Sequence, residues 1–171
     1  MASLVLTGDT SGQVTIAAPA VAGTNTITLA AQTGTLNVAG PAFSAYASSG
    51  TSVANNTLTK LTFDTEEFDT NNNFASSRFT PTVAGYYQIN GCIGGAYATL
   101  ICTIFKNGTE YKRGVTASGV TLNQANVSSI VYLNGSTDYV ELYTYQGSGS
   151  TQTMSSGSTG AYFNGCLLRG A

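Results

Sequence analysis

Residues 99–109, with the sequence TLICTIFKNGT, decide the fold class. The run of β-branched and aromatic side chains favours an extended strand. It ends in Asn107-Gly108, a pair that supplies the positive φ angles of a tight type I′ turn. The stretch therefore predicts a β-hairpin.

Similar strand-like runs recur on both sides of this hairpin and alternate with turn residues. They are residues 57–63, 86–93, 127–133, 138–145 and 161–168. No window of useful length keeps a helical period, so the pattern indicates an all-β sandwich or barrel. The final run is apolar and ends three residues before the C-terminus, and we expect it in the middle of its sheet rather than at an exposed edge. Residues 146–159, rich in Ser, Gly and Thr, are expected to form a long flexible loop.

The composition limits the classes of partner. Only 8% of the 171 residues are charged, against about 25% in a typical soluble domain. Ser, Thr, Asn and Gln must therefore supply the surface, and they suit flat β surfaces and hydrogen-bonded assembly interfaces. The net charge is −2 and no basic stripe occurs, so nucleic-acid binding is not expected. No apolar run approaches the ~20 residues that span a bilayer, and the pattern of the first residues leads us to expect no signal peptide. We expect synthesis in a host cytoplasm and no membrane association.

Side chains for catalysis are missing. The chain contains no His, which removes the usual general base and any Ser-His-Asp or Cys-His arrangement. The three cysteines, Cys92, Cys102 and Cys166, are odd in number and form no CxxC pair, so neither a disulfide framework nor a zinc site is expected. We predict a protein that is not an enzyme and that needs no cofactor.

One acidic cluster stands out, because half of the acidic residues fall within six positions. Its members are Asp64, Glu66, Glu67 and Asp69. Oxygen ligands suit Ca²⁺, so Asp64, Glu66 and Asp69 are candidate Ca²⁺ ligands. Phe74 and Thr80 stand where an EF-hand needs Gly and Glu, which excludes that loop. The alternatives are a solvated loop, or an acidic patch that pairs with Lys or Arg of a partner.

Residues 1–39 differ from the rest of the chain in composition and in the pattern of apolar residues. They contain no aromatic residue, and short alternating runs are separated by Gly and Pro. Such short strands have little core of their own, so their apolar residues must be buried against something else. The candidates for partner contact are Val14, Ile16, Ile27, Leu29 and Leu36. We expect a β-rich N-terminal arm at 1–39 and a folded domain at 40–171, with a flexible arm as the alternative.

Tyrosines form the other candidate surface. Tyr139, Tyr143 and Tyr145 share one face of their predicted strand, while the apolar residues between them share the other. Because the apolar face is the better core candidate, the tyrosine face is expected to meet a neighbour as a trimer or surface interface. Packing within the domain, or stacking on sugars, are the alternatives.

Four short motifs occur in a set order over residues 41–169. They are AFSA at 42–45, F-x-x-x-x-x-G-x-Y at 79–87, FKNG at 105–108 and AYFNGCLL at 161–168. In this order and spacing they resemble the complement globular-head and tumour-necrosis-factor-like jelly rolls. The resemblance implies an antiparallel jelly-roll β-sandwich that forms a homotrimer, with the domains packed through one sheet around a threefold axis.

Two N-terminal stretches extend the resemblance. GDTSG at 8–12 and APAVAGTNTITL at 18–29 are similar to segments that precede such domains in tailed-bacteriophage structural proteins, which implies a place in the virion. We therefore predict a trimeric capsid decoration (cement) protein, whose arm binds the major capsid protein or another virion subunit and stabilises the shell. The alternative is the tip of a tail or head fibre that recognises a host surface glycan or protein. No heptad run or collagen repeat is present to make a fibre shaft, which favours the decoration protein.

Overall fold

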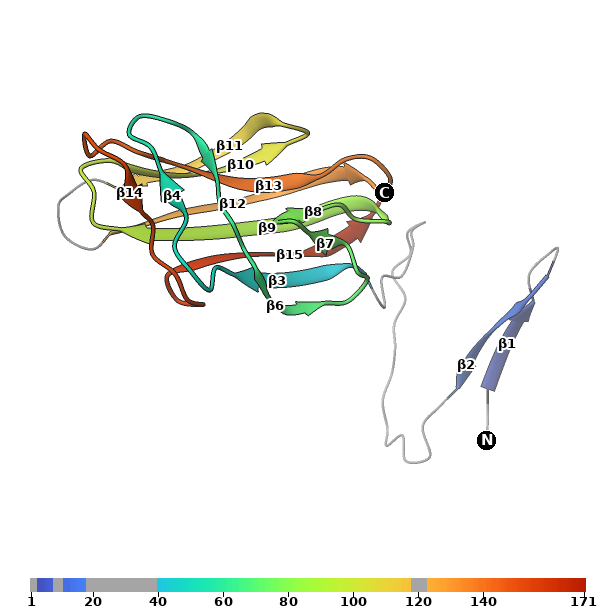
Figure 1. Ribbon diagram of the computed structural model, residues 1–171. Coiled ribbons are helices and arrows are strands. Elements are labelled where there is room, and N and C mark those ends of the chain that lie inside the picture. Colours follow the sequence, from blue (N-terminus) through green and yellow to red (C-terminus); the bar gives the residue numbers. More distant parts are fainter. Residues whose placement is uncertain (1–2, 8–10, 18–39, 118–122) are drawn as a thin grey trace. The chain divides into compact units, whose positions relative to one another are not determined.

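The computed structural model describes residues 3–7, 11–17, 40–117 and 123–171. No helix occurs among these residues, and the regular elements are strands (Figure 1). The chain divides into two compact units, residues 1–34 and 35–171. The first contains an antiparallel hairpin of β1 (Ser3–Thr7) and β2 (Gln13–Ala17).

The second unit is a sandwich of two antiparallel sheets (Figure 1). The five-stranded sheet has the order β12-β9-β15-β3-β6, with bounds Asn123–Asn134, Ala84–Gly95, Ala161–Gly170, Ala42–Tyr46 and Thr65–Asp69. The six-stranded sheet has the order β11-β10-β13-β8-β7, with bounds Thr109–Ala117, Leu100–Lys106, Val140–Gln146, Arg78–Phe79 and Phe74–Ala75. Its sixth strand, β5 (Thr59–Lys60), also pairs with β13. A short ladder of β4 (Ser52–Val53) and β14 (Gln152–Thr153) completes the unit.

Two local predictions are confirmed. The chain turns from β10 into β11 through Asn107 and Gly108, whose φ angles are 52° and 78°, as a type I′ turn requires. The apolar last strand, β15, lies between β9 and β3 in the middle of its sheet.

Two other segments differ from expectation. Of the strand predicted at 57–63, only Thr59–Lys60 pairs with β13, although the N–H of Leu61 still donates to the carbonyl of Leu142 at 2.9 Å. The stretch 146–159 is not a featureless loop, because it contains β14 and a buried Met154. Ser, Thr and Gly describe its polarity correctly but do not reveal the few buried groups that hold it.

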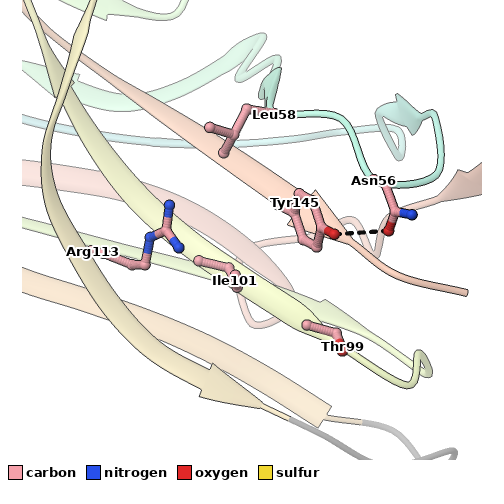
Figure 2. Close-up of a pocket in the computed structure, with 6 residues that line it drawn as sticks. All are labelled: Asn56, Leu58, Thr99, Ile101, Arg113 and Tyr145. Carbon is pink, nitrogen blue, oxygen red and sulfur yellow. Dashed lines mark hydrogen bonds between the residues drawn. The ribbon is translucent and has the colours of Figure 1, made fainter.

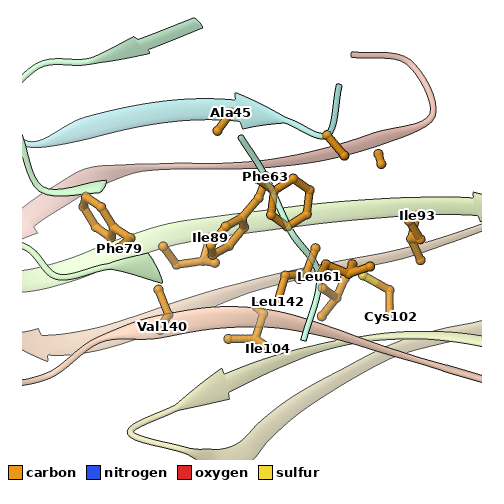
Figure 3. Close-up of a cluster of buried hydrophobic side chains, with 14 of the residues drawn as sticks. Ala45, Leu61, Phe63, Phe79, Ile89, Ile93, Cys102, Ile104, Val140 and Leu142 are labelled. Atoms are coloured by element: carbon orange, nitrogen blue, oxygen red, sulfur yellow. The ribbon is translucent and has the colours of Figure 1, made fainter. Parts of the chain in front are cut away.

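The core lies between the two sheets, and buried side chains from both sheets build it (Figure 3). On β9, Tyr87, Ile89 and Ile93 are buried, whereas Tyr86 is exposed. Successive side chains of a strand point to opposite faces, so in this part of β9 one set of side chains enters the core and the other reaches the surface.

Aromatic rings pack most densely around Phe43. Its ring centroid lies 4.9 Å from that of Phe74, 4.3 Å from that of Phe79 and 4.9 Å from that of Phe163. Burying one such side chain typically stabilises a fold by about 1.5–3 kcal/mol. The cluster therefore fixes β3 and β15 of one sheet against the β7–β8 hairpin of the other.

Candidate assembly interface

The outward face of the five-stranded sheet exposes large apolar side chains. In β12, Val127, Val131 and Leu133 are buried, while Ile130 is 54% exposed and Tyr132 is 41% exposed. The alternation follows directly from strand geometry, because the inward set fills the core and the outward set cannot reach it. Two apolar residues thus stand in water on a strand whose core face is already complete.

The same sheet exposes three more large apolar side chains. They are Phe68 on β6, Tyr86 on β9 and Leu168 on β15. Among the described residues, the six-stranded sheet exposes one comparable side chain, Tyr111 on its edge strand β11. Apolar exposure is therefore concentrated on one sheet, as expected of a protein–protein contact surface.

Two of the exposed aromatic rings are held as a pair. Tyr86 and Tyr132 lie opposite each other in β9 and β12, with ring centroids 5.5 Å apart and planes inclined at 57°. Lys106 Nζ donates to the carbonyl oxygen of Tyr132 at 2.8 Å and pairs with Asp138 at 2.9 Å. Because their positions are set before any partner arrives, less side-chain entropy is lost on association.

Uncharged polar side chains form a row across the middle of this face. Asn90 Nδ2 donates to Asn164 Oδ1 at 3.0 Å, and Ser128 Oγ donates to Asn90 Oδ1 at 2.8 Å. Gln88 Nε2 donates to Asn90 Oδ1 at 3.0 Å and to Ser128 Oγ at 2.9 Å. These groups satisfy one another and carry no formal charge, so burying the row costs far less than burying ions.

The outward face of the six-stranded sheet is occupied by side chains of its own chain. Glu141, with a side chain that is 3% exposed, accepts hydrogen bonds from Lys60 Nζ at 2.6 Å and Arg78 Nε at 2.9 Å. Burial acts to raise the pKa of Glu141, but the hydrogen bonds and charges of the two cations outweigh it and the pKa is lowered. The Arg78 guanidinium also lies 3.8 Å from the ring centroid of Tyr139. These contacts link β5, which contains Lys60, and β8, which contains Arg78, to Glu141 on β13.

The three tyrosines predicted as an interface lie on this covered face. Tyr139, Tyr143 and Tyr145 are each half-buried. Tyr143 stacks on Phe105 with centroids 3.9 Å apart, and the Tyr145 hydroxyl donates to Asn56 Oδ1 at 2.7 Å. Their contacts are made within the chain, so their role toward a neighbour stays a prediction.

Comparisons with known proteins identify the fold. No protein-family model and no curated protein sequence matches the chain. The globular domain of zebrafish complement 1qA protein superposes with a TM-score of 0.60 at 18% identity, over 78% of this chain and 100% of that one. Murine APRIL gives 0.60 at 11% identity, over 76% and 100% of the two chains. PRD1 vertex protein P5 gives 0.55 at 12% identity, over 75% and 97%.

The fold is a jelly roll of the complement 1q and tumour necrosis factor type. The predicted all-β antiparallel jelly-roll sandwich is confirmed by the strands and by these superpositions. At such low sequence identities the likeness concerns the fold alone. No helix in the described part of the chain is long and apolar enough to cross a membrane.

The hairpin that precedes the jelly roll contains two of the residues predicted to contact a partner. In its register, Val14 lies across from Leu6, and Ile16 lies across from Leu4. Leu6 is 53% exposed. The other predicted contacts lie outside the described residues: Ile27, Leu29 and Leu36.

The acidic residues predicted as Ca²⁺ ligands are engaged separately. Asp64 accepts hydrogen bonds from the Oγ of Ser48 at 2.6 Å and from its backbone N–H at 2.7 Å, and these bonds lower the pKa of Asp64. Asp69 accepts the backbone N–H groups two and five residues further along, at 3.3 Å and 2.7 Å, while Glu66 is exposed. Within the described ranges, no group of three or more carboxylate, thiol or imidazole side chains is arranged to hold a metal ion.

Sequence reasoning missed the apolar face of the five-stranded sheet. Ile130 and Tyr132 fall in a run, VSSIVYL at 127–133, in which apolar residues occupy both parities near the end. A strand that is apolar on both faces has one face for the core and one for a partner. Interpreted in this way, the sequence of this run predicts a candidate interface on β12.

Proposed function

We propose that this protein is a non-enzymatic structural component of a virus particle, and that three copies associate through the outward face of the five-stranded sheet. The exposed apolar set on that face carries the proposal. Removing apolar surface from water yields about 25 cal/mol per Å², so a surface of this kind favours self-association. Closed cyclic symmetry buries the same patch on every copy and leaves none exposed.

The polar row gives the proposed trimer its specificity. Asn90 and Asn164 lie in the polar row of this face and hydrogen-bond each other. A shifted packing would bury these amides against apolar groups without partners, at a cost of about 1–3 kcal/mol for each unsatisfied group. The row therefore favours one packing over its alternatives.

The N-terminal hairpin is assigned to attachment. A two-stranded hairpin is marginally stable alone in water, and this one exposes Val5 (46%) and Leu6 (53%). Burial against the major capsid protein or another virion subunit would stabilise it. Three arms on one trimer would bind with avidity. The likeness of the jelly roll to PRD1 vertex protein P5 supports a place in the virion, and the arm makes a decoration (cement) role the best-supported one.

The test is co-sedimentation of the purified protein with undecorated shells of the parent virus. Deleting residues 1–38 is expected to leave a folded trimer that no longer sediments with shells. In the full chain, Leu6→Asp places a charge on the face of the hairpin that exposes Leu6 and should also abolish binding. Gln13→Asp adds the same charge at a register position of the opposite face and should bind normally. A truncated trimer that still decorates shells would contradict the assignment of the arm.

A second candidate function is the tip of a tail or head fibre that recognises a host glycan or protein. A hollow on the six-stranded sheet, which Tyr145 helps to line, favours this fibre-tip function. Protein that ignores shells but binds host cells would select this alternative.

A further inference from the structure

A hollow lies on the outward face of the six-stranded sheet, where the segment that leads into β5 passes over β13, β10 and β11 (Figure 2). Its volume is about 500 Å³, within the range of small-molecule sites. The lining residues are Asn56, Leu58, Thr99, Ile101, Arg113 and Tyr145. Figure 2 shows Tyr145 between Leu58 and Asn56, and it shows Arg113 at the opposite end of the hollow from Asn56.

The floor of the hollow is apolar. Tyr145 and Ile101 are register partners in β13 and β10, so their side chains stand next to each other on the sheet. Leu58 also lines the hollow and is 36% exposed. An aromatic ring flanked by aliphatic groups suits the C–H face of a sugar ring.

Polar groups at the rim are fixed in direction. The Tyr145 hydroxyl donates to Asn56 Oδ1 at 2.7 Å, which leaves the Nδ2 group of the same amide as a donor. Glu110 holds Arg113 through two bonds, Nε to Oε1 at 2.7 Å and Nη2 to Oε2 at 2.9 Å. Because Glu110 balances the charge of Arg113, the rim presents donors without net charge, which suits hydroxyl groups better than phosphate or carboxylate.

The loops that carry these groups are held by buried hydrogen bonds. The backbone N–H of Asn56 donates to the carbonyl of Gln146 at 2.9 Å. The Gln146 side chain is buried, donates to the carbonyls of Val53 (3.1 Å) and Ser150 (2.8 Å), and accepts the N–H of Ser148 at 2.8 Å. A ligand therefore meets a preformed site and loses less affinity to loop ordering.

We propose that this hollow binds one neutral hexopyranose unit of a glycan. The sugar stacks a C–H face over Tyr145, Ile101 and Leu58, and its hydroxyl groups accept from Asn56 Nδ2 and Arg113 and exchange hydrogen bonds with the Thr99 hydroxyl. The site lies on the sheet opposite the proposed trimer interface, so the proposal of sugar binding and the proposal of a trimer are tested independently.

The experiment is saturation-transfer NMR on the full chain with methyl glycosides of glucose, galactose, mannose and their N-acetyl amino sugars as probes. At least one glycoside is expected to receive saturation, strongest on the protons of one ring face. Asn56→Ala should weaken its binding about tenfold, the effect of one lost hydrogen bond at the upper end of the usual range. Tyr111→Ala removes an exposed tyrosine of the same sheet outside the hollow and is the matched control, with binding unchanged.

A second variant fills the hollow and leaves its lining intact. A Cβ at Gly147 would lie 3.4 Å from Thr99 Cβ and 3.5 Å from Asn56 Oδ1, which is ordinary van der Waals contact. Gly147→Leu should therefore fold, keep the oligomeric mass and lose glycoside binding. The proposal is overturned if no glycoside of the panel binds the unaltered protein, or if binding survives in a folded Gly147→Leu variant.

Discussion

The outward faces of the two sheets of the jelly roll differ in how far the chain itself covers them. On the six-stranded sheet, the chain covers its own surface: Glu141 binds Lys60 and Arg78, and Phe105 stacks on Tyr143. On the five-stranded sheet, large apolar side chains are exposed to water beside a polar row whose members hydrogen-bond one another. Both faces contain tyrosines, so composition does not distinguish them. The difference is whether the outward side chains find their contacts within the same chain.

That contrast separates intramolecular from intermolecular stability. A substitution on the covered face should lower the free energy of unfolding without changing the mass of the assembly. A substitution on the open face should change the mass and leave the fold of each jelly roll intact. The predictions below test this division, beginning with the largest effect.

The largest effect is expected at Ile130, 54% exposed on the open face. Ile130→Asp removes apolar contact worth about 1.5–3 kcal/mol on full burial and adds a charge that a trimer would bury. The association constant should fall well beyond tenfold, and light scattering should detect monomer. The matched control is Tyr111→Asp on the edge strand of the other sheet, which should stay assembled. Equal dissociation of both variants would contradict an interface confined to the five-stranded sheet.

The next effect is expected at Glu141, which is buried on the covered face. Glu141→Ala removes the acceptor shared by Lys60 and Arg78, and these two cations, being partly exposed, can rehydrate. The free energy of unfolding should fall by about 2 kcal/mol, less than for a pair that is buried on both sides. Urea unfolding measures it, with the exposed Glu66→Ala as control, expected within about 0.5 kcal/mol of the unaltered protein. A loss equal to that of the control would show that the ion pairs contribute nothing.

A third effect is a loss of stability in acid. The pKa of Glu141 is lowered because the bonds and charges of Lys60 and Arg78 outweigh the effect of burial, and the pKa of Asp138 is lowered by hydrogen bonds from Asn107 and Lys106. A carboxyl group with a lowered folded-state pKa contributes stability above its unfolded pKa, and this contribution is lost as pH falls through the folded value. The thermal midpoint should therefore drop as pH falls below about 4.5, the ordinary value for Glu. The slope should be shallower in Glu141→Gln, and an unchanged slope would contradict the role of this group.

The smallest effect is expected at Tyr143, on the covered face of the six-stranded sheet. Tyr143→Leu removes the ring that stacks on Phe105 and should cost about 1 kcal/mol of unfolding free energy. The assembly mass should stay the same, because the contact is made within one chain. If light scattering instead shows dissociation, the tyrosine face belongs to the interface, as the sequence alone predicts.

Much of the fold was within reach of the sequence. The Asn107-Gly108 turn and the apolar run of 161–168 follow from local chemistry: positive φ angles and a strand too apolar for an edge. The extent of pairing at 57–63 did not follow, because it depends on how far the segment runs alongside β13.

The site was harder to predict than the fold. Tyr139 and Tyr143 are contacted by residues from distant parts of the chain, Arg78 and Phe105, and their predicted role as an interface stays a prediction. Periodicity assigns a side chain to a face of a strand, and it carries no information on what another segment places over that face.

The central claim is that the five-stranded sheet joins three copies of this chain. Sedimentation equilibrium of the unaltered protein over a wide range of concentration tests it most directly. The account predicts a single species of three times the 17.5 kDa chain mass, persisting to low micromolar concentration. A 17.5 kDa species at every concentration would contradict it, because the apolar face would then be stable in water without a partner.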